Sequence, residues 1–188
     1  IRPLFDMTGS HHFNEVFFEE VRVPVDRRVG DENAGWYILA ELLDFERSGI
    51  GTTASQKHTL EKLAGNLRTG SQSHRERYRT RLADLVVANN VGRFLGYRIG
   101  YIQANGMVPN YEASVVKIFQ SELGQKIYNF GVSQLGLSGQ MMPEEPKAPL
   151  NGDLPEAYIQ AVPSTIYSGS NEIQRNVIAT RGLGLPRG

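Results

Sequence analysis

The feature that most constrains the fold is a run of apolar residues spaced three and four apart between positions 116 and 130. These residues are Val116, Phe119, Leu123, Ile127 and Phe130. This spacing places their side chains on one face of an α-helix. The run therefore predicts an amphipathic helix, which ends at the glycine-containing segment 136–139.

Helical spacing recurs in two earlier segments and in one shorter late segment. The first segment starts near Ala34 and can continue through residue 67, although Gly49 and Gly51 weaken its middle. The second starts after a break at 68–73 and ends at Asn105-Gly106. The last runs from about 170 to 179, with Ser168, Ser170 and Asn171 as candidate N-caps. The apolar positions of the two earlier runs are Trp36, Leu39, Leu43, Ile50, Leu60, Leu63, Leu67, Leu82, Leu85, Val86, Leu95, Ile99 and Ile102.

The segments outside these helices predict little regular structure. Residues 11–25 are rich in β-formers and indicate one or two strands that stop at Pro24. Residues 141–155 hold four prolines and an Asn-Gly pair, which predicts a loop. We therefore expect a mainly α protein, an antiparallel four-helix bundle preceded by a short β segment.

Composition excludes several function classes. Twenty Lys and Arg balance twenty Asp and Glu, so the chain lacks the cationic excess of a general nucleic-acid binder. It contains no cysteine, which excludes thiolate chemistry and cysteine-ligated metals, and we expect no metal site. No apolar run is long enough to cross a bilayer. We expect a cytoplasmic protein, and because the chain begins with Ile1, a piece of a longer chain.

The first candidate for chemistry is the segment Leu43-Asp44-Phe45-Glu46-Arg47. Glu46 follows apolar neighbours, and burial among them would raise the affinity of its carboxylate for a proton, as a general base requires. The alternative is a structural ion pair on the helix surface, because neighbouring Glu and Arg are common on helices.

Two further segments contain candidate binding residues. In 166–175, a turn with Gly169 leads into a helix N-terminus, whose backbone N–H groups attract anions. A plain N-cap explains the same pattern. The segment 133–139 is either a cofactor cradle or a glycine-rich helix end, and it does not match a dinucleotide fingerprint.

Taken together, these segments resemble the C-terminal portion of an acyl-CoA dehydrogenase. FNEVFFEEVRVP is similar to the end of that family's middle β domain, which predicts a boundary between 1–30 and a helical domain at 31–188. GDENAGWYILAELLDFER is similar to the entry of the helical domain. IYSGSNEIQRNVIATRGLGLPR is similar to its terminal helix.

The resemblance implies an FAD-dependent α,β-desaturation of an acyl-CoA thioester. The family's usual base position holds Ser168, so the resemblance assigns the base to Glu46, with Asp44 and Arg47 on the substrate side. It places Tyr167, Ser168 and Gly169 along the acyl pocket, with the Ser168 backbone N–H donating to the thioester carbonyl. It implies cofactor contacts from Gln134, Gly136, Ser170, Asn171 and Glu172.

Two departures from the family pattern concern the flavin. An Arg-X-X-Phe-Gly motif, which grips a neighbouring subunit's flavin, is missing between Leu67 and Leu82, and the paired glycines after Gln134 are altered. The resemblance therefore favours a heterotetramer in which this chain carries the base, with an electron-transfer flavoprotein as electron acceptor. The alternatives are a non-catalytic partner that completes another chain's flavin site, and a related flavoenzyme with a non-CoA substrate.

Overall fold

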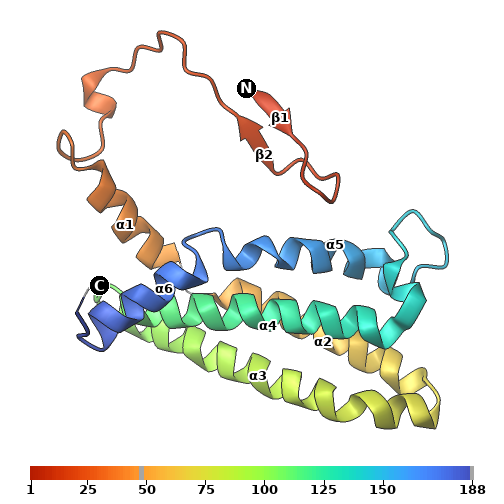
Figure 1. Ribbon diagram of the computed structural model, residues 1–188. Coiled ribbons are helices and arrows are strands. Elements are labelled where there is room, and N and C mark those ends of the chain that lie inside the picture. Colours follow the sequence, from red (N-terminus) through yellow and green to blue (C-terminus); the bar gives the residue numbers. More distant parts are fainter. Residues whose placement is uncertain (47–48, 187–188) are drawn as a thin grey trace. The chain divides into compact units, whose positions relative to one another are not determined.

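A computed structural model describes residues 1–46 and 49–186, and the side chains of residues 44–46 are not described. The chain divides into two compact units, Ile1–Leu42 and Leu43–Gly188 (Figure 1). In the described residues, helices predominate and the one sheet has two short antiparallel strands, which confirms the predicted fold class.

The first unit contains one strand within the predicted segment 11–25, but that strand ends at Glu15 and not at Pro24, and its partner strand at 2–4 was not predicted. Strand β1 (Arg2–Leu4) pairs antiparallel with β2 (Phe13–Glu15), with Leu4 opposite Phe13 and Arg2 opposite Glu15. The β-formers at 16–23 lie outside any strand, because β1 offers only three residues for β2 to pair with. A short 3-10 turn, η1 (Val25–Arg27), follows Pro24.

The first predicted helix is two helices. Helix α1 (Gly35–Glu46) and helix α2 (Ile50–Thr69) are separated at Gly49, whose φ of +66° is left-handed. A residue in this conformation interrupts the helical hydrogen-bond ladder, so the expectation of one continuous helix was wrong. Glu46 is the last residue of α1 that the structure describes.

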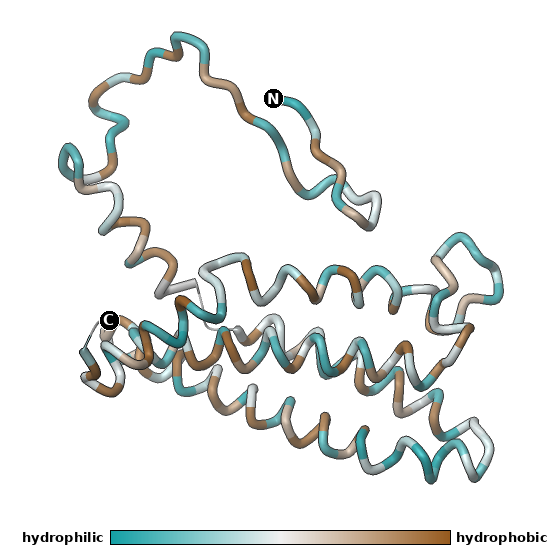
Figure 2. The backbone as a smooth tube through the Cα atoms, in the orientation of Figure 1, coloured by the Kyte–Doolittle hydropathy of each residue, from teal (hydrophilic) through white to brown (hydrophobic). Residues whose placement is uncertain are grey.

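Three long helices build the second unit: α2, α3 (Gln72–Ala104) and α4 (Tyr111–Leu135) (Figure 1). The predicted breaks at 68–73 and 105–106 are confirmed. Ser71 caps α3 by accepting a hydrogen bond from His74 N at 3.2 Å. Hydrophobic and hydrophilic residues alternate along these helices with helical spacing, as Figure 2 shows.

The core lies where α2, α3 and α4 meet and is extended by one leucine from α5 (Asp153–Ala161). The predicted stripe of α4 is buried except for Phe119, which is partly buried. The main cluster consists of Leu60, Leu63, Leu67, Leu82, Leu85, Leu123, Ile127, Phe130 and Leu154. Ile99, Ala113 and Val116 form a second, smaller cluster.

The C-terminal part of the chain packs across α4. After α4 come two 3-10 segments, η2 (Gly136–Gln140) and η3 (Pro149–Gly152). Helix α5 begins at Asp153 and covers the last three residues of the predicted loop, and it is a helix that the sequence did not predict. A 3-10 turn, η4 (Pro163–Thr165), leads to helix α6 (Asn171–Val177) and a π-helical turn, η5 (Ile178–Gly182). None of the helices in the described residues has the length and apolar content needed to cross a membrane.

Candidate functional site

A cavity of about 220 Å³ lies in the second unit, between the start of α2, the N-terminal half of α4 and the segment 164–168. Leu43 and Gly49 are part of its wall, and they lie on either side of the segment that carries the predicted base. Tyr167 and Ser168, both predicted substrate residues, line the same cavity. The full lining is Leu43, Gly49, Thr52, Val116, Lys117, Gln120, Ser121, Ser164, Tyr167 and Ser168.

The turn that presents Tyr167 and Ser168 to the cavity has an unusual backbone. Ser168 has a φ of +54° and Gly169 a φ of +84°, so two consecutive residues are left-handed. A non-glycine residue adopts this conformation at a cost of about 1–2 kcal/mol, and the surrounding structure must hold it there. Gln174 helps to stabilise this turn, because its Nε2 donates to Gly169 O at 3.2 Å and to Ser168 O at 3.4 Å.

Gln174 is a residue of this turn that the sequence analysis did not assign to the site. Its side chain is 1% exposed and is directed back toward the turn. The sequence offered only its spacing as a signal, a glutamine four residues after the candidate N-cap Ser170. Ser170 is the cap that the structure shows, since its Oγ accepts from Ile173 N at 3.4 Å.

The predicted base segment is only partly described. The backbone of Asp44 and Glu46 forms the end of α1, while their side chains and all of Arg47 lie outside the described residues. The catalytic role of Glu46 and the substrate roles of Asp44 and Arg47 stay predictions.

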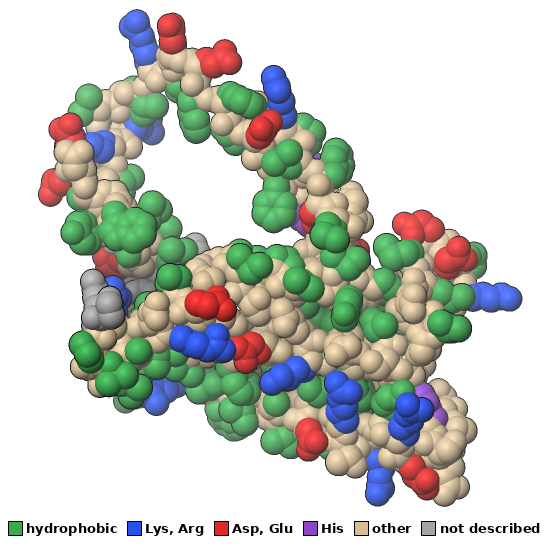
Figure 3. Space-filling view, viewed as in Figure 1, with side chains coloured by type: hydrophobic (Ala, Val, Ile, Leu, Met, Phe, Trp, Pro, Cys, Tyr) green, Lys and Arg blue, Asp and Glu red, His purple; other side chains and the backbone are tan. Residues whose placement is uncertain are grey.

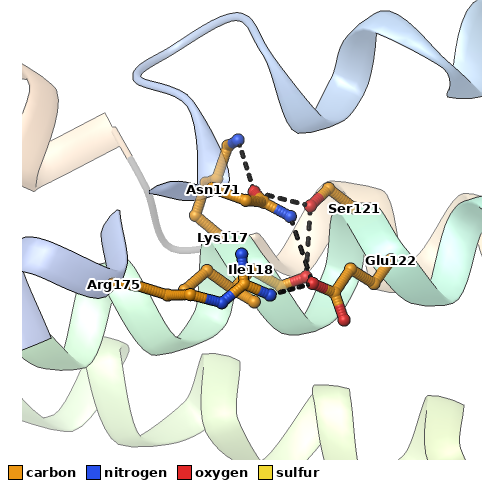
Figure 4. Close-up of polar contacts among 6 residues, drawn as sticks. All are labelled: Lys117, Ile118, Ser121, Glu122, Asn171 and Arg175. Carbon is orange, nitrogen blue, oxygen red and sulfur yellow. Dashed lines mark hydrogen bonds and ion pairs between the residues drawn. The ribbon is translucent and has the colours of Figure 1, made fainter. Parts of the chain in front are cut away.

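Asn171, a predicted cofactor residue, instead joins α6 to α4 (Figure 4). Its Oδ1 accepts from Lys117 Nζ at 2.7 Å and from Ser121 Oγ at 3.2 Å. Its Nδ2 donates to Glu122 Oε1 at 3.4 Å, and Arg175 donates to the same oxygen at 2.5 Å. Because Lys117 and Ser121 also line the cavity, this network fixes one of the cavity walls to the terminal helix.

Backbone N–H groups at the N-terminus of α6 are hydrogen-bonded to side chains of the same segment. The pKa of the Glu172 carboxyl lies below its ordinary value, first because its own backbone N–H donates to it, then because of the Ser170 hydroxyl and the nearby charges of Arg175 and Lys117. Ser170 Oγ accepts from Ile173 N, and the Glu172 carboxyl accepts from its own backbone N–H. These two N–H groups, which the sequence analysis proposed for anion binding, therefore have partners within the protein.

Gln134 and Gly136 lie near the other end of α4. Gln134 is 3% exposed, and its Nε2 donates to Leu63 O at 3.0 Å and to Asn66 Oδ1 at 3.3 Å. Gly136 is exposed, with a φ of +58°. Ser121, which contacts Asn171, lies thirteen positions before Gln134 in α4, a rise of about 20 Å at roughly 1.5 Å per residue. The predicted cofactor residues therefore form two groups, one beside the middle of α4 and one at its C-terminal end.

A set of buried polar side chains behind the cavity was not predicted. Gln120 Nε2 donates to Thr53 Oγ1 at 2.7 Å, and Gln56 Nε2 donates to Gln120 O at 2.9 Å. Asn89 Nδ2 donates to Thr53 O at 3.1 Å, which adds α3 to the set. These bonds fix the positions of three helices around the cavity, since unpaired buried amides would be costly.

Gly49→Ala is expected to destabilise the protein by about 1–2 kcal/mol, because alanine is strained at positive φ. The added Cβ would also lie 2.6 Å from Gln120 Cδ, inside the polar set. Thermal unfolding of the complete chain measures the effect.

Gly51→Ala is the matched control, two residues away. Gly51 lies in α2 with nothing within 4 Å of an added Cβ, so alanine there should stabilise by about 0.5–1 kcal/mol. Equal effects of the two substitutions would contradict the assigned role of the Gly49 turn.

The family model for the acyl-CoA dehydrogenase C-terminal domain matches residues 33–183, and the chain belongs to this family. Among curated proteins, acyl-CoA dehydrogenase IpdE1 of Mycobacterium tuberculosis is 31% identical over 193 residues, which cover 100% of this chain and 48% of the relative. Acyl-CoA dehydrogenase FadE26 of the same organism is 29% identical over 98% of this chain and 48% of its own length. The chain thus spans about half the length of these relatives.

The solved structures agree with the sequence relatives. The chain is similar to the Tcur3481-Tcur3483 steroid ACAD G363A variant, with a TM-score of 0.84 and 27% identity over 92% of this chain and 46% of that one. It is also similar to the ChsE4-ChsE5 complex from Mycobacterium tuberculosis, with a TM-score of 0.83 and 26% identity over 99% of this chain and 49% of that one. Members of the family that resemble this chain thus include complexes of two named chains.

Proposed function

We propose that the protein containing this chain is an FAD-dependent acyl-CoA dehydrogenase in which Glu46 removes the α-proton of an acyl-CoA thioester. The observation that carries the proposal is the cavity, because its wall joins Leu43 and Gly49, on either side of Glu46, with Tyr167 and Ser168. The two segments that the family resemblance assigns to substrate therefore border one space, although they lie at opposite ends of the helical unit in sequence.

The residues of this chain perform the proton chemistry in this proposal. The Glu46 carboxylate accepts the proton from the α carbon. The Ser168 backbone N–H donates to the thioester carbonyl and stabilises the charge that develops on its oxygen. Bound FAD would supply the acceptor for the β-hydrogen and its electron pair, and the acyl-CoA product would carry a double bond between its α and β carbons. Tyr167 and Thr52 bound the space for the acyl group.

The chain fits one part of an FAD site. Glu172 and Gly136 are exposed and accessible to a ligand. The Asn171 amide and the Ser170 hydroxyl are used within the protein, and so is the amide nitrogen of Gln134. We therefore infer that the rest of the flavin contacts come from other parts of the protein or from a partner, and that this chain by itself binds FAD weakly.

We further propose an assembly of two unlike chains, with this chain as the base-bearing one. The missing Arg-X-X-Phe-Gly motif supports this proposal, because a chain without that flavin-binding motif needs a partner chain that provides the flavin contact. The similarity to two-chain complexes supports it as well. An electron-transfer flavoprotein is the proposed electron acceptor.

Native mass spectrometry of the complete protein, purified together with its co-expressed partner, tests this proposal by counting FAD per chain. We expect one FAD for each pair of unlike chains. One FAD per identical chain would replace the two-chain assembly with an ordinary homo-oligomer. The absence of FAD from every assembly would favour the alternative, a non-catalytic partner, which the serine at position 168 also permits.

A further inference from the structure

The side chain of Gln120 presents a buried hydrogen-bond acceptor at the cavity wall. Gln120 lies in α4, is 4% exposed and is part of the cavity lining. Its Nε2 donates to Thr53 Oγ1 at 2.7 Å, whereas its Oε1 accepts no hydrogen bond from the residues that the structure describes. Because a buried carbonyl oxygen without a donor is costly, this atom calls for a partner that enters the cavity.

The orientation of the Gln120 amide follows from the hydrogen bonds of Thr53. The Thr53 hydroxyl donates its one proton to Gly49 O at 3.2 Å. Its oxygen therefore acts only as an acceptor toward Gln120, which requires the NH₂ group on that side of the amide. Oε1 then lies beside Gly49, where it would overlap a Cβ built on that residue. The missing side chain at Gly49 thus leaves room for the acceptor at the cavity wall.

The cavity is large enough for a small ring, and most of its polar groups are neutral. Its volume of about 220 Å³ exceeds the roughly 150 Å³ of a protein cavity that holds benzene. Lys, Arg, Asp and Glu side chains are seen across the outer surface of the helical unit in Figure 3. Among the described lining residues, in contrast, Lys117 is the only charged one. Hydroxyl groups are supplied by Thr52, Ser121, Ser164, Tyr167 and Ser168. A plain hydrocarbon in this space would separate such groups from water without offering them partners.

The acceptor and the nearby charge select the chemical group that binds. Oε1 needs a donor, which is a hydroxyl, an amide N–H or an ammonium. Lys117 precedes Gln120 by three residues, so both side chains lie on one face of α4 and border the same cavity. The positive charge of Lys117 disfavours an ammonium there. A hydroxyl is neutral, donates one hydrogen bond and keeps an oxygen that is compatible with the lysine. The amides of the CoA pantetheine are a second source of a donor, which the experiment below distinguishes.

We propose that the substrate is an acyl-CoA with a compact, hydroxylated acyl group, whose hydroxyl donates to Gln120 Oε1. This inference rests on the proposed function, which makes the cavity the acyl pocket. It goes further by naming a class of acyl group and by making Gln120 a specificity-determining residue. The hydroxyl lies beyond the β carbon, because the α and β carbons are the ones that lose hydrogen.

Calorimetric titration of the complete protein in its FAD-loaded assembly tests the proposal. The probes are (cyclohexylthio)acetyl-CoA and its analogues with a hydroxyl on ring carbon 2, 3 or 4. Sulfur replaces the β carbon in all of them, so no hydride leaves and binding is measured without turnover. We expect one hydroxylated probe to bind about 3- to 10-fold more tightly than the plain ring, the gain from one neutral hydrogen bond.

The remaining outcomes of the titration separate this inference from the proposed function. Equal or weaker binding of every hydroxylated probe would overturn the inference alone, and water or a pantetheine amide would then be the partner of Oε1. If no probe bound, including the plain ring, the proposed function would fail together with the inference.

Two glutamine variants separate recognition from packing. Gln120→Met keeps an unbranched side chain of similar size without the acceptor, so the affinity ratio of the hydroxylated to the plain probe should fall to about one. Gln56→Met is the matched control, because Gln56 is a buried amide of the same polar set and is not part of the cavity lining. It should preserve the ratio. An unchanged ratio in Gln120→Met, or its loss in both variants, would refute the role of Gln120.

A milder pair at Thr53 serves if the glutamine variants do not fold. Thr53→Val removes the hydroxyl that orients the Gln120 amide, and the affinity ratio should fall. Thr53→Ser keeps that hydroxyl and should preserve the ratio. The same ratio in both Thr53 variants would contradict the assigned orientation of the acceptor.

Discussion

Glu46→Gln is expected to lower the turnover of the complete enzyme by about 10²–10⁴-fold or more, because a glutamine amide cannot accept the α-proton. The flavin should remain bound, since the substitution changes one carboxylate to an amide of similar size. Anaerobic mixing with an acyl-CoA substrate would measure the rate at which the flavin absorbance bleaches, apart from any step with the electron acceptor.

Glu41→Gln is the matched control, because Glu41 is an exposed residue of the same helix and outside the predicted site. It should leave the bleaching rate unchanged. A Glu46→Gln enzyme that still bleached at the original rate would remove Glu46 from the chemistry. An enzyme that lost its flavin would indicate a structural role at the end of α1 instead.

Leu63→Ala is expected to have the largest effect on stability, a loss of about 2–5 kcal/mol in the free energy of unfolding. Leu63 is 0% exposed and belongs to the main core cluster. An alanine there removes buried apolar surface and leaves a cavity against Gly131, since Leu63 Cδ2 lies 3.3 Å from the position of a Cβ built on that glycine. Chemical denaturation of the complete protein, followed by far-ultraviolet circular dichroism, measures the loss.

Leu137→Ala provides the same chemical change at a position that is 87% exposed. It should alter the free energy of unfolding by no more than about 0.5 kcal/mol. Comparable losses in the two variants would mean that the core does not lie among α2, α3 and α4 as described.

The helices of the bundle were the most predictable part of the fold. The apolar stripes at 60–67 and 116–130 identified core residues directly, because a helix with one buried face carries apolar residues three and four positions apart. The stripe of α3 was less reliable, since Val86 lies on the exposed face although it follows the buried Leu85. Periodicity alone does not separate a face buried in the core from one that is apolar for another reason.

The candidate site was predictable in its segments and not in its contacts. The sequence identified the turn at 166–171, but it offered Asn171 only as an N-cap or a cofactor ligand and did not indicate that it links two helices. Its contacts with Lys117 and Ser121 depend on how α6 crosses α4, which local spacing does not encode. The same holds for Gly49, whose left-handed conformation divides one periodic segment into two helices.

The cavity is built from both ends of the helical unit, with Leu43 and Gly49 on one side and Ser164 to Ser168 on the other. During synthesis the long helices α2, α3 and α4 leave the ribosome before the segment that closes the cavity. The hydrophobic core can therefore assemble before there is a place for a ligand. A ligand that enters afterwards binds only the finished arrangement, so it holds the first and last segments together and adds its binding free energy to the stability of the whole unit.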